Sequence, residues 1–153
     1  MAPVLYAFDQ AREDLARATA DLTTEEIWAS PHGFGSVGFH IAHIAGSTER
    51  LMNYLQGRAL TEAQWAALRA EPALSGIARG PLLGMLDRAL GEAGKVVRAI
   101  DPAALAEPRA VGRERLPTTV IGLLTHIAEH TQRHTGQAIS AAKWTVALRH
   151  GTP

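Results

Sequence analysis

Apolar residues recur at alternating spacings of three and four along most of the chain, which is the pattern of amphipathic helices. The pattern predicts four such helices, over residues 4–22, 37–55, 81–100 and 120–141. Ser36 stands where it can cap the second helix, and Gly57 marks its expected end. Asp101 and Pro102 stop the third helix, because the residue before a proline disfavours helical backbone.

The connections between these helices are longer than a minimal bundle needs. The segment 23–26, Thr-Thr-Glu-Glu, resembles a capped first turn and predicts a short helix there. A second short helix is expected around 61–70, and the segment 102–117, rich in Pro, Gly and Arg, is expected to be a loop. The chain is therefore predicted to be all-α, with one domain over 1–153 built as a four-helix bundle with long crossover loops.

Composition narrows the range of functions. The chain carries 15 basic and 15 acidic side chains, and its zero formal charge provides no basic face for nucleic acid or an anionic membrane surface. It has no cysteine, which excludes disulfides, thiolate metal ligands and a cysteine nucleophile. No apolar run is long enough to span a membrane, and the first residues do not form a signal peptide. We therefore expect a cytoplasmic protein with neither nucleic-acid nor membrane partners.

Five of the seven histidines fall in two clusters at helical spacing. His40 and His43 lie on the second predicted helix, and the fourth carries His126, His130 and His134. Two histidines four residues apart on a helix point the same way and can chelate one ion. Three in a row span roughly 12 Å of helix axis and cannot all bind one ion. One histidine of the fourth helix is therefore not a ligand of this ion.

Helical geometry selects among these histidines. At about 100° per residue, His134 and His130 lie about 20° and 60° from the centre of the apolar face, whereas His126 lies about 100° away, at the rim. The pair His130/His134 therefore faces the bundle interior. On the second helix His40 lies about 60° and His43 about 120° from the apolar centre, so periodicity alone favours His40. Three neutral imidazoles around a divalent ion leave a position open for water or substrate, as in catalytic zinc sites.

A second motif overlaps the histidines of the fourth helix. Residues 126–130 read His-x-x-Glu-His, the inverted signature of a class of zinc peptidases, in which Glu129 would be the general base. Glu129 lies about 160° from the apolar centre and is expected to point to solvent, which argues against this alternative.

Two segments of the chain resemble the motifs of the DinB-like family. One is the run 36–46, Ser-Val-Gly-Phe-His-Ile-Ala-His-Ile-Ala-Gly, followed by Arg50 and Leu51, which is similar to the motif on that family's second helix. The other is the run 130–137, which has the family's form H-x-x-x-H-x-G-Q on the fourth helix. The segment 54–60 also fits the family's loop signature, so the resemblance spans most of the chain in the expected helix order.

The resemblance implies a four-helix bundle, often a homodimer, with one divalent metal held by one histidine of the second helix and two of the fourth. Carried over to this sequence, the ligands are His43, seven positions after Ser36, together with His130 and His134. His40, which periodicity favours, is the alternative ligand on the second helix. Zinc and nickel are the first expectations for the metal, although imidazole also suits copper and iron.

For function, the resemblance implies a metal-dependent enzyme. Characterised members of the family include transferases that add the thiols bacillithiol or mycothiol to electrophiles, and a mycothiol-dependent maleylpyruvate isomerase. We therefore expect a thiol S-transferase or a hydrolase that acts on a small-molecule electrophile or thiol, with the metal activating a thiol or water. Since the chain lacks cysteine, the low-molecular-weight thiol must arrive as co-substrate. His126, one turn from the ligand pair, is the candidate catalytic group that takes or relays the proton.

Two other functions stay open at this point. One is a non-catalytic metal-binding bundle that serves as a stress-associated interaction protein, in which a fourth protein ligand would fill the open position. The other is a haem-binding bundle that uses facing histidines. Arg50 lies on nearly the same helix face as His43, and the sequence favours a solvated arginine over one that binds an acidic substrate group.

Overall fold

The computed structural model describes residues 1–30, 33–149 and 151. His32 and His150, the two histidines outside the predicted clusters, lie beyond the described residues. Within the described ranges, no helix combines the length and the apolar character needed to cross a membrane.

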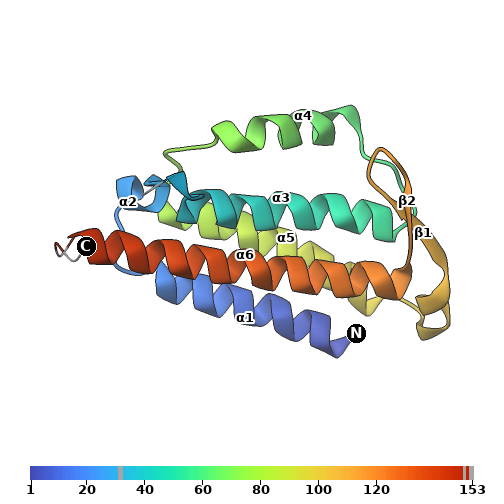
Figure 1. Ribbon diagram of the computed structural model, residues 1–153. Helices are drawn as coiled ribbons and strands as arrows, with labels where there is room; N and C mark the ends of the chain where they lie inside the picture. The colour runs from blue at the N-terminus through green and yellow to red at the C-terminus, as the bar shows by residue number, and fades with distance from the viewer. Residues whose placement is uncertain (31–32, 150, 152–153) are drawn as a thin grey trace.

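Four long helices form a bundle (Figure 1). They are α1 (Ala2–Ala18), α3 (Val37–Leu55), α5 (Arg79–Arg98) and α6 (Val120–Arg149). α6 packs against α1 and α3, and α5 contacts the same two helices from behind in the view of Figure 1. α3 and α5 run in one direction while α1 and α6 run in the other. The predicted all-α four-helix bundle is confirmed.

The helix boundaries follow local capping. Ser36 caps α3 as predicted, and its Oγ accepts a hydrogen bond from Phe39 N at 3.0 Å. Thr119 Oγ1 accepts from Gly122 N at 3.1 Å at the start of α6. α1 ends earlier than the apolar pattern indicates, because the chain leaves helical geometry at Thr19. Leu22 still reaches the core, but from the turn that follows the helix.

Two short helices occupy the connections, as the sequence predicts. α2 (Thr24–Trp28) begins with a complete capping box, and α4 (Glu62–Ala70) begins with another. A single turn of 3₁₀ helix, η2 (Glu71–Ala73), follows α4 directly. Figure 1 shows α4 outside the bundle, above α3 and running back alongside it, on the path from the end of α3 to the start of α5. This crossover returns the chain to the end of the bundle where α5 begins.

The segment 102–117, expected to be a loop, contains regular structure instead. It holds a 3₁₀ helix, η3 (Pro102–Ala106), and an antiparallel hairpin of β1 (Pro108–Val111) and β2 (Leu116–Thr119). Gly112 and Arg115 adopt positive φ angles of 75° and 52°, which close the turn between the strands. The Arg109 side chain donates to the carbonyl of Leu55 at 2.7 Å and ties the hairpin to the end of α3. This tertiary contact fixes the position of the hairpin, whose strands are too short to show the alternating pattern of longer strands.

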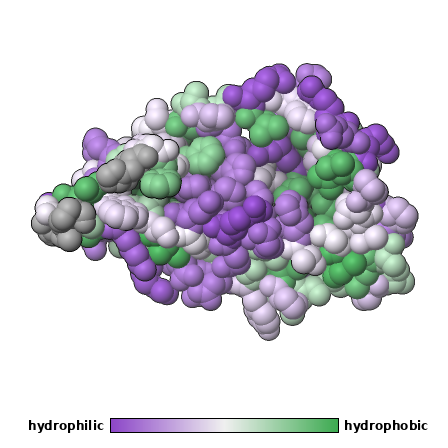
Figure 2. All heavy atoms as spheres, in the orientation of Figure 1, coloured by the Kyte–Doolittle hydropathy of each residue, from purple (hydrophilic) through white to green (hydrophobic). Residues whose placement is uncertain are grey.

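The core between the helices is mainly apolar, and buried polar side chains lie among the apolar ones. Large side chains that are almost fully buried fill the space between the helices, among them Phe8, Ile44, Leu86, Leu124 and Ile127. Buried polar side chains on α3 and α6 interrupt this packing; they are His40, Ser47, Thr48, Arg50, Thr131, Thr135 and Thr145. Figure 2 shows hydrophilic residues gathered across the middle of the visible face, with hydrophobic residues toward both ends. A functional site is therefore expected between α3 and α6.

Candidate metal centre

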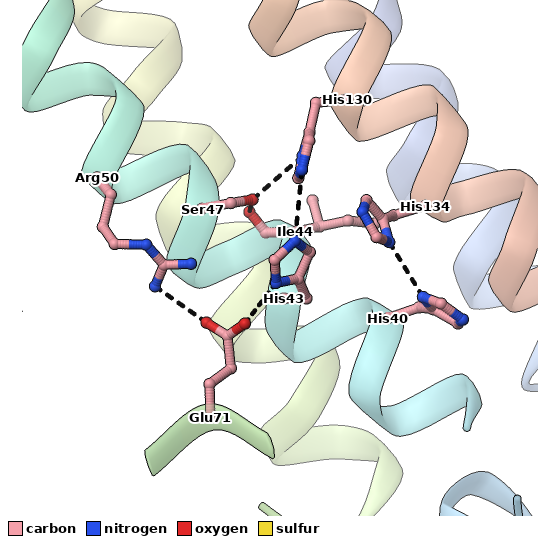
Figure 3. Close-up of polar contacts among 8 residues, drawn as sticks. All are labelled: His40, His43, Ile44, Ser47, Arg50, Glu71, His130 and His134. Atoms are coloured by element: carbon pink, nitrogen blue, oxygen red, sulfur yellow. Dashed lines mark hydrogen bonds and ion pairs between the residues drawn. The ribbon is translucent and has the colours of Figure 1, made fainter. Parts of the chain in front are cut away.

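Three histidines from two helices converge between α3 and α6 (Figure 3). His43 on α3 and the pair His130 and His134 on α6 each offer a ring nitrogen, and these three atoms lie within 4.8 Å of one another. His43 Nε2 lies 3.3 Å from His130 Nε2. The ring centroids of the three residues are 4.4–5.1 Å apart. No other group of three potential ligands is found among the described residues.

Local structure explains why these side chains meet. His130 and His134 are one turn apart on α6, so both imidazoles project from the same face. The cap at Ser36 sets the start of α3 and places His43 in its second turn. The Phe39 ring stacks on the His43 imidazole, with centroids 5.6 Å apart and planes inclined by 17°.

A buried carboxylate fixes the outer nitrogen of His43. Glu71, in the 3₁₀ turn after α4, accepts a hydrogen bond from His43 Nδ1 through one oxygen, since an ionised carboxylate can only accept. Its second oxygen binds Arg50 Nη1 at 2.9 Å. Burial raises the pKa of Glu71, but the hydrogen bond from His43 and the charge of Arg50 outweigh burial and bring this pKa below its ordinary value. Glu71 is therefore an anion, and the imidazole of His43 keeps its proton on Nδ1.

The outer nitrogens of the other two histidines also have partners. His130 Nδ1 lies 3.4 Å from Ser47 Oγ, and Ser47 Oγ donates to the carbonyl of Ile44 at 3.2 Å. His134 Nδ1 lies 3.0 Å from Nδ1 of the buried His40. In all three histidines Nδ1 thus has a partner outside the group. Nε2 of His43 and Nε2 of His130 face each other, and Nε2 is the nitrogen of His134 without a partner outside the group. Such outer partners fix the tautomer and ring orientation of metal-binding histidines.

Burial and neighbouring groups keep the imidazoles of His130 and His134 neutral. Burial, followed by the neighbouring His134 and His43, lowers the pKa of His130 to about 4. Burial, followed by His43 and His40, lowers the pKa of His134 to about 4 as well. Burial and the proximity of His43 also lower the pKa of His40. Neutral imidazole is the form that binds metal, so the group is prepared for a cation at neutral pH.

The structure brings some of the predicted site residues together and leaves others outside the group. The three histidines at the predicted metal positions come together, whereas His40, the alternative on α3, lies outside the group and contacts His134 instead. His126 lies at the rim with 46% of its side chain exposed, and its ring centroid is 5.6 Å from that of His130. Glu129 is exposed and paired with Arg133 at 2.9 Å. This position does not suit the general base that the peptidase motif requires.

Two site residues were not anticipated from the sequence, and a third was misjudged. Glu71 and Ser47 carry no signal in the apolar pattern or the motifs that identifies them. Arg50, expected to be solvated, is only 8% exposed because it packs under α4 and pairs with Glu71. Gly46 is the one local indication: a β-carbon there would lie 2.7 Å from Glu71 Oε2 and 2.8 Å from Arg50 Nη1. The absence of a side chain at Gly46 lets the carboxylate approach α3.

Comparison with known proteins identifies relatives of this chain. The sequence matches the DinB superfamily over residues 7–138. The fold is similar to that of YfiT from Bacillus subtilis, described as "a probable metal-dependent hydrolase with an unusual four-helix bundle topology", with a TM-score of 0.66 and 15% sequence identity. The match covers 98% of this chain and 87% of YfiT. None of the curated proteins matches the sequence significantly.

The depressed pKa values predict how the metal-free protein responds to acid. In the unfolded chain His130 and His134 take up protons near their ordinary pKa of 6.5. In the folded protein they do so only when the pH reaches about 4. The unfolded state therefore binds more protons in this window, and the free energy of unfolding should fall as the pH drops from about 6.5 toward about 4. Urea denaturation of chelator-treated protein measures this slope. The double variant His130→Gln, His134→Gln should have a shallower slope, and an equal slope would refute the assignment.

Proposed function

This chain belongs to the DinB superfamily, and we propose that it is a metal-dependent enzyme in which His43, His130 and His134 hold one divalent ion. The observation that carries this proposal is the orientation of the three imidazoles. Each has its Nδ1 directed to an outer partner, which leaves three Nε2 atoms for one ion. Zinc and nickel both suit three imidazole ligands.

The ligand set favours catalysis over a structural role. Structural zinc sites are closed by four protein ligands, whereas catalytic sites use three and leave a position for water or substrate. Among the described residues the group contains three ligands, and both oxygens of the nearby Glu71 are engaged by His43 and Arg50. A haem is disfavoured, because ring centroids only 4.4–5.1 Å apart leave no room for a macrocycle between the histidines.

The reaction we propose uses a nucleophile that the metal activates. A divalent ion at this position lowers the pKa of a coordinated water or thiol and so supplies a nucleophile at neutral pH. A hydrolase needs only water, and the fold is shared with a protein described as a probable metal-dependent hydrolase. A transferase needs a low-molecular-weight thiol from outside, because the chain has no cysteine of its own. The substrate in either case is a small-molecule electrophile.

His126 is the residue we propose for handling the proton. Its side chain is half exposed at the rim of the site, one turn along α6 from His130. Its Nδ1 lies 3.8 Å from a carboxylate oxygen of Glu129, too far for a hydrogen bond, so the ring stays open to solvent. The ring therefore lies where it can pass a proton from the nucleophile to water.

The metal assignment predicts the effect of removing each ligand. Alanine in place of His43, His130 or His134 should cost most of the bound metal, because two imidazoles cannot complete the site. Metal content of the purified variants, measured by mass spectrometry of the digested protein, checks this. His126→Ala is the matched control on α6 and should keep its metal. Full metal retention in His130→Ala would overturn the proposal.

The role of Glu71 predicts a graded loss of affinity. Removing an outer partner of a metal-binding histidine typically weakens metal binding about 10–100-fold. Glu71→Ala should therefore raise the dissociation constant for zinc by about this factor, measured by competition with a chromophoric chelator. Glu13→Ala, at an exposed glutamate on α1, is the control and should leave affinity unchanged. Equal affinities in both variants would show that Glu71 does not act on the centre.

The proposed role of His126 predicts a loss of rate with the metal retained. Substrates are sought in a panel of activated esters and in thiol-transfer assays with electrophiles. On any substrate found, His126→Gln should turn over more slowly than wild type at equal metal occupancy, because proton transfer contributes about 10²–10⁴-fold in such sites. Loss of metal would instead make His126 a ligand, and unchanged kinetics would remove it from the mechanism.

A further inference from the structure

A cavity of about 650 Å³ lies under α4, between α3 and α5. No histidine lines it, so it is separate from the candidate metal centre. The two sites share one wall, made of Arg50 and Glu71, since both of these residues line the cavity.

The space exists because the helices around it present small side chains. α3 contributes Ala42, Ala45 and Gly46, and α5 contributes Ala89 and Ala93. The roof is α4, which buries none of its own residues in the bundle. α4 is held at its two ends instead, by the bond from Gln64 to Glu49 at 3.0 Å and by the contacts of Glu71. Packing between the helices thus leaves the volume beneath α4 unfilled.

Arg50 directs unused hydrogen-bond donors to this cavity. Although the residue is only 8% exposed, the only side-chain bond it makes within the described residues is that from Nη1 to Glu71. Its Nε and Nη2 are left over, and a guanidinium carries five N–H donors. No buried side-chain nitrogen or oxygen in the described part of the chain is sealed off without a partner. The spare donors of Arg50 must therefore be reached from open space, and the cavity is the space that Arg50 lines.

The remaining charges on the cavity wall favour an anion. Arg58 and Arg88 also line it, and neither makes an ion pair with any described residue. The acidic residues on the wall are already engaged: Glu49 by Gln64, Glu71 by His43 and Arg50, and Glu92 by Lys95. Glu49 keeps its negative charge, because the amide of Gln64 is neutral, but Arg58 and Arg88 together outweigh it.

The floor of the cavity is apolar. Met52 on α3 is almost fully buried, Met85 on α5 is half buried, and both line the cavity. We propose that this cavity binds an amphipathic organic anion, whose carboxylate accepts hydrogen bonds from Arg50 and whose apolar body lies against Met52 and Met85. Leu74, Val96 and the alanines of the lining extend this apolar part of the wall, which suits the body of such a ligand.

The three methionines of the chain allow a direct test. Met52 and Met85 line the cavity, and Met1 precedes α1 and is not part of the lining. Protein labelled with ¹³C at the methionine methyls is titrated with octanoate after treatment with a chelator, so that no metal can attract the carboxylate. The methyl signals of Met52 and Met85 should shift and saturate while that of Met1 stays in place. Signals of Met52 and Met85 that do not move would overturn the proposal.

The charge requirement is tested with an uncharged analogue and a variant. 1-Octanol has a similar apolar body without the carboxylate and should bind at least about tenfold more weakly, the scale of a charge-assisted hydrogen bond. Arg50→Gln should reduce the affinity for octanoate by a similar factor and leave that for octanol unchanged. Equal binding of the two ligands would make the cavity a purely apolar space and refute the anion site.

The location is tested by filling the cavity. Ala89→Phe places a large side chain in it from α5, away from the histidines, and should abolish octanoate binding. Ala66→Phe, on the exposed face of α4 and outside the lining, is the matched control and should bind as wild type does. Octanoate binding that survives in Ala89→Phe would place the ligand elsewhere. Circular dichroism verifies that both variants are folded.

Discussion

Burial of imidazoles between α3 and α6 imposes the constraint on which the site depends: each ring nitrogen needs a partner. A buried polar group without one costs free energy comparable to a lost hydrogen bond or more. The chain provides a partner for the outer nitrogen of each of the three histidines, from Glu71, Ser47 and His40. The inner nitrogens face one another instead, and a single cation satisfies all of them together. The same requirement explains why Glu71 must be ionised and why Arg50 is buried beside it.

The fold was largely predictable because its helices are long and strongly periodic. Local rules also placed the cap at Ser36, since a capping side chain needs only the neighbouring backbone. The hairpin escaped prediction because its strands, Pro108–Val111 and Leu116–Thr119, are too short to show alternation. Its position is fixed by the bond from Arg109 to the end of α3, a contact over 54 positions that the sequence does not reveal.

The candidate site was predictable only where its geometry is local. His130 and His134 share one helix face, so their spacing already indicates a pair. Periodicity favoured His40 over His43, and His40 is indeed the more buried of the two. Depth in the core is the wrong criterion, however, because a ligand must point along the groove between two helices, and only the resemblance to the family's motif indicated His43. The homodimer that the same resemblance implies stays a prediction.

The α4 crossover contributes to the candidate site, although none of the residues of α4 itself is buried. It carries Glu71 to the outer side of His43, across 28 positions of sequence, and it roofs the neighbouring cavity. A connection longer than the bundle needs thus completes one site and encloses another. Arg50 belongs to both sites, because it binds Glu71 and lines the cavity.

The central claim is that three imidazoles hold one ion through their inner nitrogens and leave a position free. Anomalous diffraction from crystals of the zinc-loaded protein, recorded at the zinc absorption edge, tests it most directly. We predict one anomalous peak between α3 and α6, bonded to Nε2 of His43, His130 and His134 and otherwise to a ligand that is not protein. A zinc ion that takes a fourth ligand from the chain, or that binds through Nδ1 of any of the three, would contradict the account.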